Sequence, residues 1–141
     1  MAVKQLSVFV ENRNGRLSEV VKVLSEGAVN LRALTIGDSE DFGIIRLIVS
    51  DIDKAKALLE NDYIVKTTDV VAVKLDDTEG ALYKSLEVLE DADISIKYAY
   101  AFTSHSGAYG IIRVDDVASI EKALASKGLT LATDDDLKTM N

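Results

Sequence analysis

The chain has 141 residues, of which 48% are hydrophobic, so it can bury the core of one domain or of two small ones and is not disordered. Its net charge of −8 argues against nucleic acid as a partner, because phosphate binding relies on clustered Lys and Arg. The absence of cysteine excludes disulfides, thiol chemistry and metal sites built on Cys.

Residues 4–66 predict one strand–helix–strand–strand–helix–strand unit. Apolar residues alternate in the first strand, and Leu17, Val20 and Leu24 then fall at helical spacing. A short polar turn at 37–41 is typical of a hairpin. The elements in chain order are a strand at 4–11, a helix at 16–26, strands at 29–36 and 42–49, a helix that Asp51 caps, and a short strand at 63–66.

The same order then repeats, which predicts a duplicated domain. Residues that an offset of 65 aligns include Gly15 with Gly80, Leu24 with Leu89, and Asp51 with Asp116. The tetrapeptide Gly-Ile-Ile-Arg occurs at 43–46 and again at 110–113, with an offset of 67, which predicts a second hairpin two residues longer. The elements expected are a strand at 71–75, a helix carrying Leu82, Leu86 and Leu89, strands at 94–102 and 110–114, a helix that Asp116 caps, and a closing segment at 129–133.

Two such units predict an α+β protein of two tandem ferredoxin-like βαββαβ domains, each an antiparallel sheet with its helices on one face. The expected boundaries are 1–67 and 68–134, followed by a polar C-terminal tail at 135–141 that frays. Continuous alternation places Phe9, Leu34 and Ile36 on the helix-free face. That face, or the strand edges, then needs cover from the other repeat or from another chain.

The corner between the first strand and the first helix, residues 12–16, is the strongest candidate for a binding site. The first N–H groups of a helix have no partner within it, so they can hold a carboxylate, and Gly15 lets a ligand approach the backbone. Asn12 can bond the ammonium or carboxylate group of an amino acid. Asn and Gly are also ordinary in tight turns, so spacing alone leaves a purely structural corner open. Asn30, at a strand start where Asn is disfavoured, is open to the same two interpretations.

The run Val-Glu-Asn-Arg-Asn-Gly-Arg-Leu at 10–17, followed by Gly-Ala-Val-Asn-Leu at 27–31, resembles the ACT domain. It is similar in particular to the serine-binding ACT domain of phosphoglycerate dehydrogenases, whose motif is His-Glu-Asn-Arg-Pro-Gly-x-Leu and then Gly-Val-Asn-Ile. Both repeats share the resemblance, the first more closely, and the whole chain looks like small bacterial proteins made of two tandem ACT domains. The resemblance implies a regulatory module that binds a small ligand, usually an amino acid, where two ACT domains face each other.

The resemblance also implies which residues contact the ligand. Asn12 and Asn30 would contact it from facing domains, with Gly15 beside its carboxylate. Val10 stands where the serine-binding motif has His, which favours a more apolar amino acid, and Asn14 replaces Pro, which loosens the loop. The ligand-binding residues expected in the first repeat are Asn12, Arg13, Asn14, Gly15, Arg16, Leu17, Asn30 and Leu31.

The second repeat is expected to hold a weaker, degenerate site, or to complete the first one as its partner surface. Asp77 stands where Asn12 does, so a carboxylate would repel the carboxylate of the ligand, although it could hold the ammonium group. Ser95 stands where Asn30 does. The residues of this second site are Asp77, Thr78, Glu79, Gly80, Ala81 and Ser95.

The function expected is that of a non-enzymatic sensor or regulator with a free amino acid as its ligand. It would act allosterically as a homodimer through its ACT sheets, with no cofactor, no metal and no membrane partner, and the sequence does not indicate a target enzyme. The N-terminus lacks the apolar core of a signal peptide and no apolar run approaches 18 residues, which favours a cytoplasmic protein.

Two alternatives stay open. The first is an acylphosphatase-like hydrolase on the same topology, for which Arg13 and Arg16 lie in the loop that would hold a phosphate. The second is a structural interaction module without a ligand.

His105, the single histidine, is expected to be a solvated turn residue, and Tyr98 and Tyr100 should share one strand face.

Overall fold

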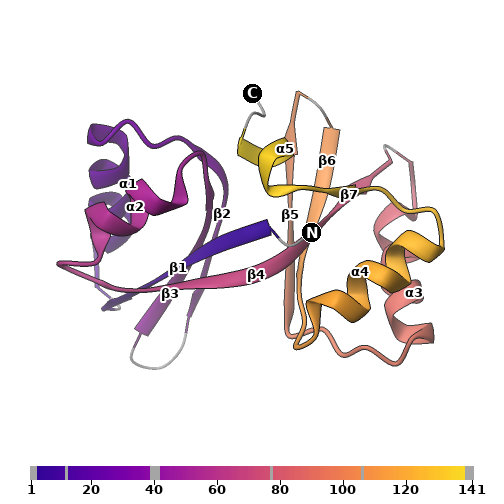
Figure 1. The fold of residues 1–141 in the computed structure, drawn as a ribbon. Coiled ribbons are helices and arrows are strands. Elements are labelled where there is room, and N and C mark those ends of the chain that lie inside the picture. The colour runs from indigo at the N-terminus through magenta and orange to yellow at the C-terminus, as the bar shows by residue number, and fades with distance from the viewer. Residues whose placement is uncertain (1–2, 12, 39–41, 77, 106, 139–141) are drawn as a thin grey trace. The chain divides into compact units, whose positions relative to one another are not determined.

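A computed structural model describes residues 3–11, 13–38, 42–76, 78–105 and 107–138. The chain divides into two compact units, Lys4–Thr68 and Asp69–Asn141, the second of which also takes in Val3. Figure 1 colours the first unit indigo to magenta and the second pink to yellow. Within the described residues, no helix is both long and apolar enough to cross a membrane.

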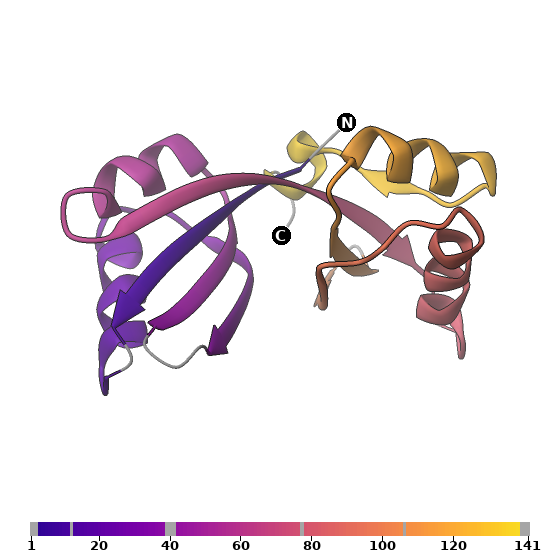
Figure 2. The same ribbon diagram turned by 90° about the horizontal axis from the view of Figure 1, so that it is seen from below.

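The first unit follows the predicted order of elements. They are β1 (Val3–Glu11), α1 (Arg16–Glu26), β2 (Leu31–Asp38), β3 (Phe42–Val49), α2 (Ile52–Leu59) and the first part of β4 (Ile64–Leu75). The strands lie in the order β2-β3-β1-β4, and α1 and α2 cover the same side of them (Figures 1 and 2). β2 begins two residues later than predicted because Ala28, at φ 59°, and Val29 complete the C-terminal turn of α1.

The core of the first unit lies between its sheet and its two helices. Val8 and Val10 face the helices, and Phe9 between them lies on the helix-free face, as predicted. The side chains of this core that have no exposed surface are Leu6, Val8, Val20, Leu24, Ile45, Leu47, Ala55 and Leu59. Full burial of each large aliphatic side chain stabilises the folded state by roughly 1.5–3 kcal/mol. This well-packed layer therefore holds the end of β1 and the start of α1 in place.

A bulge in β2 decides which face its later residues take. The register with β3 shifts between Leu31 and Ala33, which leaves Arg32 as an extra residue. Beyond the bulge, Leu34 and Ile36 pair with core residues of β3 and therefore lie on the helix side of the sheet. The prediction that these two residues lie on the helix-free face is wrong, because it assumed unbroken alternation.

The second unit has the same arrangement. After β4 it contains α3 (Ala81–Asp91), β5 (Tyr98–Ser104), β6 (Gly107–Arg113), α4 (Val117–Ser126), β7 (Leu131–Ala132) and α5 (Asp134–Lys138). The strands lie in the order β5-β6-β4-β7, which matches β2-β3-β1-β4 of the first unit. β4 is one continuous strand where the sequence predicted two, because residues 67–70 include no Gly or Pro that would end a strand.

The two hairpins have the same register, so the predicted two-residue extension of the second one is wrong. Asp38 pairs with Gly43 in the first hairpin, and Thr103 pairs with Ala108 in the second. Both pairs follow the offset of 65 that aligns the helices. The repeated Gly-Ile-Ile-Arg segments are therefore two residues out of register, and Gly43 corresponds to Ala108 rather than to Gly110.

The core of the second unit departs from the first at one helix position. Ser85 of α3 stands where α1 has Val20, and its side chain is 1% exposed. Among the described residues, the Ser85 hydroxyl has no hydrogen-bond partner. A buried hydroxyl without a partner destabilises a core, so this position weakens the second unit relative to the first.

The C-terminal segment is partly ordered, which corrects the expectation of a frayed tail. In α5, the Asp136 carboxylate accepts a hydrogen bond from the Thr133 N–H at 2.8 Å, and the Thr133 hydroxyl accepts one from the Asp136 N–H at 3.1 Å. This reciprocal cap starts the helix, and Leu137 within it is buried. Residues 139–141 lie outside the described residues. The predicted fold class, two tandem ferredoxin-like units with antiparallel sheets, is confirmed.

Candidate functional site

The corner between β1 and α1 leaves the start of the helix open. Gly15 is the residue before α1 and has φ 88°, a left-handed conformation that favours glycine. No side chain caps α1 in the described part of the chain, whereas Asp51 caps α2 and Asp116 caps α4 through backbone N–H groups. A Cβ on Gly15 would have no described atom within 4 Å. The Arg16 N–H donates to the Arg13 carbonyl at 3.5 Å, but the N–H groups of Leu17 and Ser18 have no partner among the described residues and can hold a ligand.

A hollow of about 390 Å³ lies at this corner. Most of the predicted residues of the first site line it, together with Val10, whose position in the motif the sequence had singled out, and with Ile36 and Gly43, which the sequence did not predict. The lining residues are Val10, Glu11, Arg13, Asn14, Gly15, Arg16, Leu17, Ser18, Ile36 and Gly43. Asn12, the predicted polar contact, lies outside the described residues.

The charged side chains at the corner pair with one another. Arg16 donates to Glu19 at 3.0 Å and lies 3.2 Å from Glu11, and Arg13 donates to the same Glu11 carboxylate at 3.3 Å. The hydrogen bond from Arg16 is the main reason that the pKa of Glu11 is lowered, and the same bond raises the pKa of Arg16. The two arginines balance the two glutamates, so this network has groups of both signs and no net charge.

Tyr63, which follows α2, ties this network to the rest of the unit. Its hydroxyl donates to the Glu19 carboxylate at 3.2 Å, and the Arg16 guanidinium lies 5.9 Å from the centre of its ring. This hydrogen bond is the largest cause of the lowered pKa of Glu19. Burial is the largest cause of the raised pKa of Tyr63, with the bond to Glu19 second. The network therefore fixes the position of Arg16 at the edge of the hollow.

The second repeat keeps only one carboxylate of this network, Asp76 in place of Glu11. At the offset of 65, its residues are Asp76 for Glu11, Thr78 for Arg13, Ala81 for Arg16, Lys84 for Glu19 and Gly128 for Tyr63. The corner glycine is retained, since Gly80 has φ 80° before α3 and that helix also has no side-chain cap, and Leu82 stands in place of Leu17. Thr78, Glu79 and Gly80 are exposed, and Asp77 lies outside the described residues.

Asn30 and Leu31 do not lie at the corner of their own unit. They line a separate hollow of about 410 Å³ with residues from the C-terminal part of α1, which is the other end of that helix. The Asn30 N–H donates to the Ser50 hydroxyl at 3.0 Å, and the Asn30 carbonyl accepts from the Ser50 N–H at 2.9 Å. The backbone of Asn30 is thus fixed while its side chain is exposed.

The second unit has a larger hollow, of about 830 Å³, between α3 with its following loop and α4. Ser95 belongs to its lining. A change in side-chain size explains why it is open there: Leu58 packs against Gly27 in the first unit, and the aligned residues of the second are Ala123 and Ala92. The loss of one large side chain therefore contributes to this hollow.

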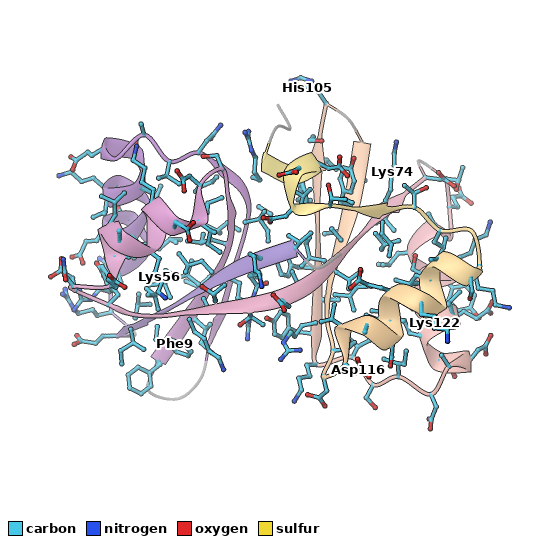
Figure 3. The ribbon with its side chains drawn as sticks, viewed as in Figure 1. Phe9, Lys56, Lys74, His105, Asp116 and Lys122 are labelled. Carbon is cyan, nitrogen blue, oxygen red and sulfur yellow. The ribbon has the colours of Figure 1, made fainter. Side chains whose placement is uncertain are left out.

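The other singled-out residues take their predicted places. His105 is exposed at the turn between β5 and β6 (Figure 3). Tyr98 and Tyr100 share the face of β5 opposite the helices, together with Phe102, whose ring stacks on Tyr109 at 5.5 Å.

The sequence missed Glu19 and Tyr63, and a comparison of the repeats could have found them. Both lie outside the motif, and Tyr63 is 44 residues from its partner. Their replacement by Lys84 and Gly128 in the repeat that departs from the motif is the available signal.

Comparisons with known proteins agree with this architecture. A solved structure of a Bacteroides thetaiotaomicron protein matches with a TM-score of 0.90 and 40% identity over 99% of this chain and 97% of that one. The ligand-free regulatory subunit of aspartate kinase from Thermus thermophilus shares the fold, with a TM-score of 0.62 and 14% identity over 87% of this chain and 91% of that one.

In sequence, 53 residues are 38% identical to the acetolactate synthase small subunit of Haemophilus influenzae. That match spans 38% of this chain and about a third, 32%, of the relative. The family described as an ACT domain pair matches residues 1–141. The two βαββαβ units, their shared register and this match over the whole length lead to one conclusion: the chain belongs to the ACT domain family, as an ACT domain pair.

Proposed function

We propose that this ACT domain pair is a non-enzymatic regulatory protein that binds a free amino acid at the corner between β1 and α1. The observation that carries the proposal is the uncapped start of α1, where Gly15 opens onto a hollow of about 390 Å³. The first N–H groups of α1 would hold the carboxylate of the ligand. The Glu11 carboxylate, together with Asn12, would hold its ammonium group.

The balanced charges of the corner suit a zwitterion. A phosphate or acyl phosphate carries net negative charge and would need an excess of cations, but the charges of Arg13 and Arg16 are balanced by those of Glu11 and Glu19. This pairing weighs against the acylphosphatase-like alternative.

A second ACT unit would complete the binding site, as the resemblance implies when it places Asn12 and Asn30 on facing domains. Asn30 and Leu31 lie beside the C-terminal end of α1, whereas the corner lies at its N-terminal end. They would therefore contact a ligand held by a facing unit rather than one at the corner of their own unit. A homodimer offers such a unit. β2 ends the strand order of the first unit, and Leu34 and Ile36 on it are 39% and 51% exposed, which gives an edge that a second chain could cover.

Regulation would follow from a difference in ligand affinity between two arrangements of the paired domains. The names of two similar proteins, a small subunit of acetolactate synthase and a regulatory subunit of aspartate kinase, support a role beside an enzyme rather than as one. The target of this chain would be such an enzyme.

A thermal-shift screen against the twenty amino acids tests the proposal. A ligand present at 100 times its Kd stabilises the folded state by about 2.7 kcal/mol, which raises the Tm of a chain of this size by roughly 5–10 °C. One amino acid, or one chemical group of them, should give such a rise at millimolar concentration. If no amino acid raises the Tm, the chain is an interaction module without this ligand and the proposal is overturned.

A further inference from the structure

Gly43 has no side chain to fill the hollow at the β1–α1 corner. Gly43 pairs with Val10, so both residues belong to the helix side of the sheet, the side on which Val10 joins the core. Ile36 lies on the same side, because the bulge in β2 pairs it with the core residue Ile45. All of these except Ile45 line the hollow, and together with Leu17 they make one of its walls apolar.

We propose that Gly43, Val10 and Ile36 form the subsite for the ligand's side chain, and that they select an aliphatic amino acid. This inference rests on the proposed function and adds the chemical class of the ligand. Glu11 and Arg16 stand on the loop side of the hollow, where they suit the charged main-chain groups of the ligand. The side chain then points at the sheet, where the lining offers apolar atoms.

The missing side chain of Gly43 sets the depth of this subsite. A Cβ there would lie 3.2 Å from Val10 Cγ2, and the only other described atom within 4 Å would be the Gly37 carbonyl oxygen at 3.8 Å. The contact with Val10 is tight, so Val10 must shift by a few tenths of an ångström, but no other described side chain lies within 4 Å of that Cβ. Ile36, which is 51% exposed, provides apolar surface that a bound side chain would cover.

In the second repeat, a side chain occupies the position of Gly43. Ala108 stands where the first repeat has Gly43, and its partner is Leu75, which is larger than Val10. Ala101 stands in place of Ile36, so the apolar wall is also reduced. These three exchanges remove the subsite from the repeat that also lacks the charged network.

The test exchanges Gly43 for the residue of the second repeat and measures binding of a panel of amino acids to the full chain by calorimetry. In the wild type, aliphatic amino acids should bind more tightly than serine, aspartate and lysine. Gly43→Ala should weaken the best aliphatic ligand by about 10–200-fold, the effect of about one methylene in an apolar pocket, and should shift the preference toward a smaller side chain.

Gly110→Ala is the matched control, because it adds a methyl group to a buried strand glycine of the other unit. Its Cβ would lie 3.5–3.8 Å from three side-chain atoms, which is ordinary contact and looser than the 3.2 Å contact at Gly43, so binding should stay unchanged. Circular dichroism melting of both variants checks that they fold. A polar or charged amino acid as the best ligand, or an unchanged preference in folded Gly43→Ala, would overturn the subsite while leaving the proposed function intact. Failure of every amino acid to bind the wild type would instead refute the proposed function itself.

Discussion

A comparison of Gly15 with Gly80 separates two roles of the corner glycine: its effect on backbone conformation and its effect on ligand binding. They hold φ 88° and 80° at the same position before α1 and α3, and neither would place a Cβ within 4 Å of a described atom. Replacing either by Ala therefore adds backbone strain without a collision. The strain is about 1–2 kcal/mol, and the loss of unfolded-state entropy offsets about 0.4–1 kcal/mol of it.

We expect each variant to lose about 1 kcal/mol of stability, which corresponds to a Tm lower by about 2–4 °C. The two losses should agree, because the two conformations agree. Binding should separate the variants: a methyl group on Gly15 obstructs the approach of a carboxylate to the start of α1, whereas one on Gly80 lies in the repeat without the charged network.

Urea unfolding of both variants, followed by calorimetric titration with the amino acid found in the screen, measures the two effects. Clearly unequal stability losses would refute the argument from backbone conformation. Equal losses of affinity in Gly15→Ala and Gly80→Ala would refute the claim that the first repeat provides the ligand site.

Three further predictions concern single side chains. Tyr63→Phe removes the hydroxyl that donates to Glu19, so the pKa of Glu19 should rise toward its usual range in a carboxyl NMR titration, and an unchanged pKa would show that the bond is not formed in solution. Ser85→Val restores the residue type of Val20 and removes a buried hydroxyl without a described partner, so urea unfolding should show about 1–2 kcal/mol of added stability, and a loss would mean that the site has no room for the larger side chain. The pKa of Asp116 is lowered below its usual 3.8, chiefly by the hydrogen bond from the Ser119 hydroxyl, so this group stabilises the fold above that value and the contribution is lost as pH falls through the lower pKa of the folded state. Stability measured between pH 5 and about 2 should consequently fall less steeply in Asp116→Asn than in the wild type, and parallel curves would contradict the assignment.

The sequence was a good guide to the elements and to the duplication, because both depend on local periodicity. Alternation ending at Glu11, helical spacing from Arg16, and the caps Asp51 and Asp116 all describe short-range structure. What it missed depends on pairing between strands. The bulge at Arg32 reversed the faces of Leu34 and Ile36, and a repeated tetrapeptide suggested a register that the hairpins do not have.

The candidate site divides in the same way. Gly15 and the open start of α1 could be read from the motif, because a strand that turns directly into a helix has this geometry. The roles of Glu19, Tyr63 and Gly43 could not, since they come from segments that meet the corner only in the folded unit. Asn30 remains a predicted contact, and its distance from the corner along α1 means that its role depends on a facing unit.

The central claim is that a free amino acid binds at the corner of the first repeat. An amide NMR titration of the 141-residue chain with the amino acid from the screen tests it most directly. The account predicts that saturable shifts concentrate at residues 13–18, at Gly43, and at Asn30 and Leu31, while the aligned Gly80 and Ala108 stay unperturbed. Saturable shifts confined to the second repeat, or equal shifts at Gly15 and Gly80, would contradict it.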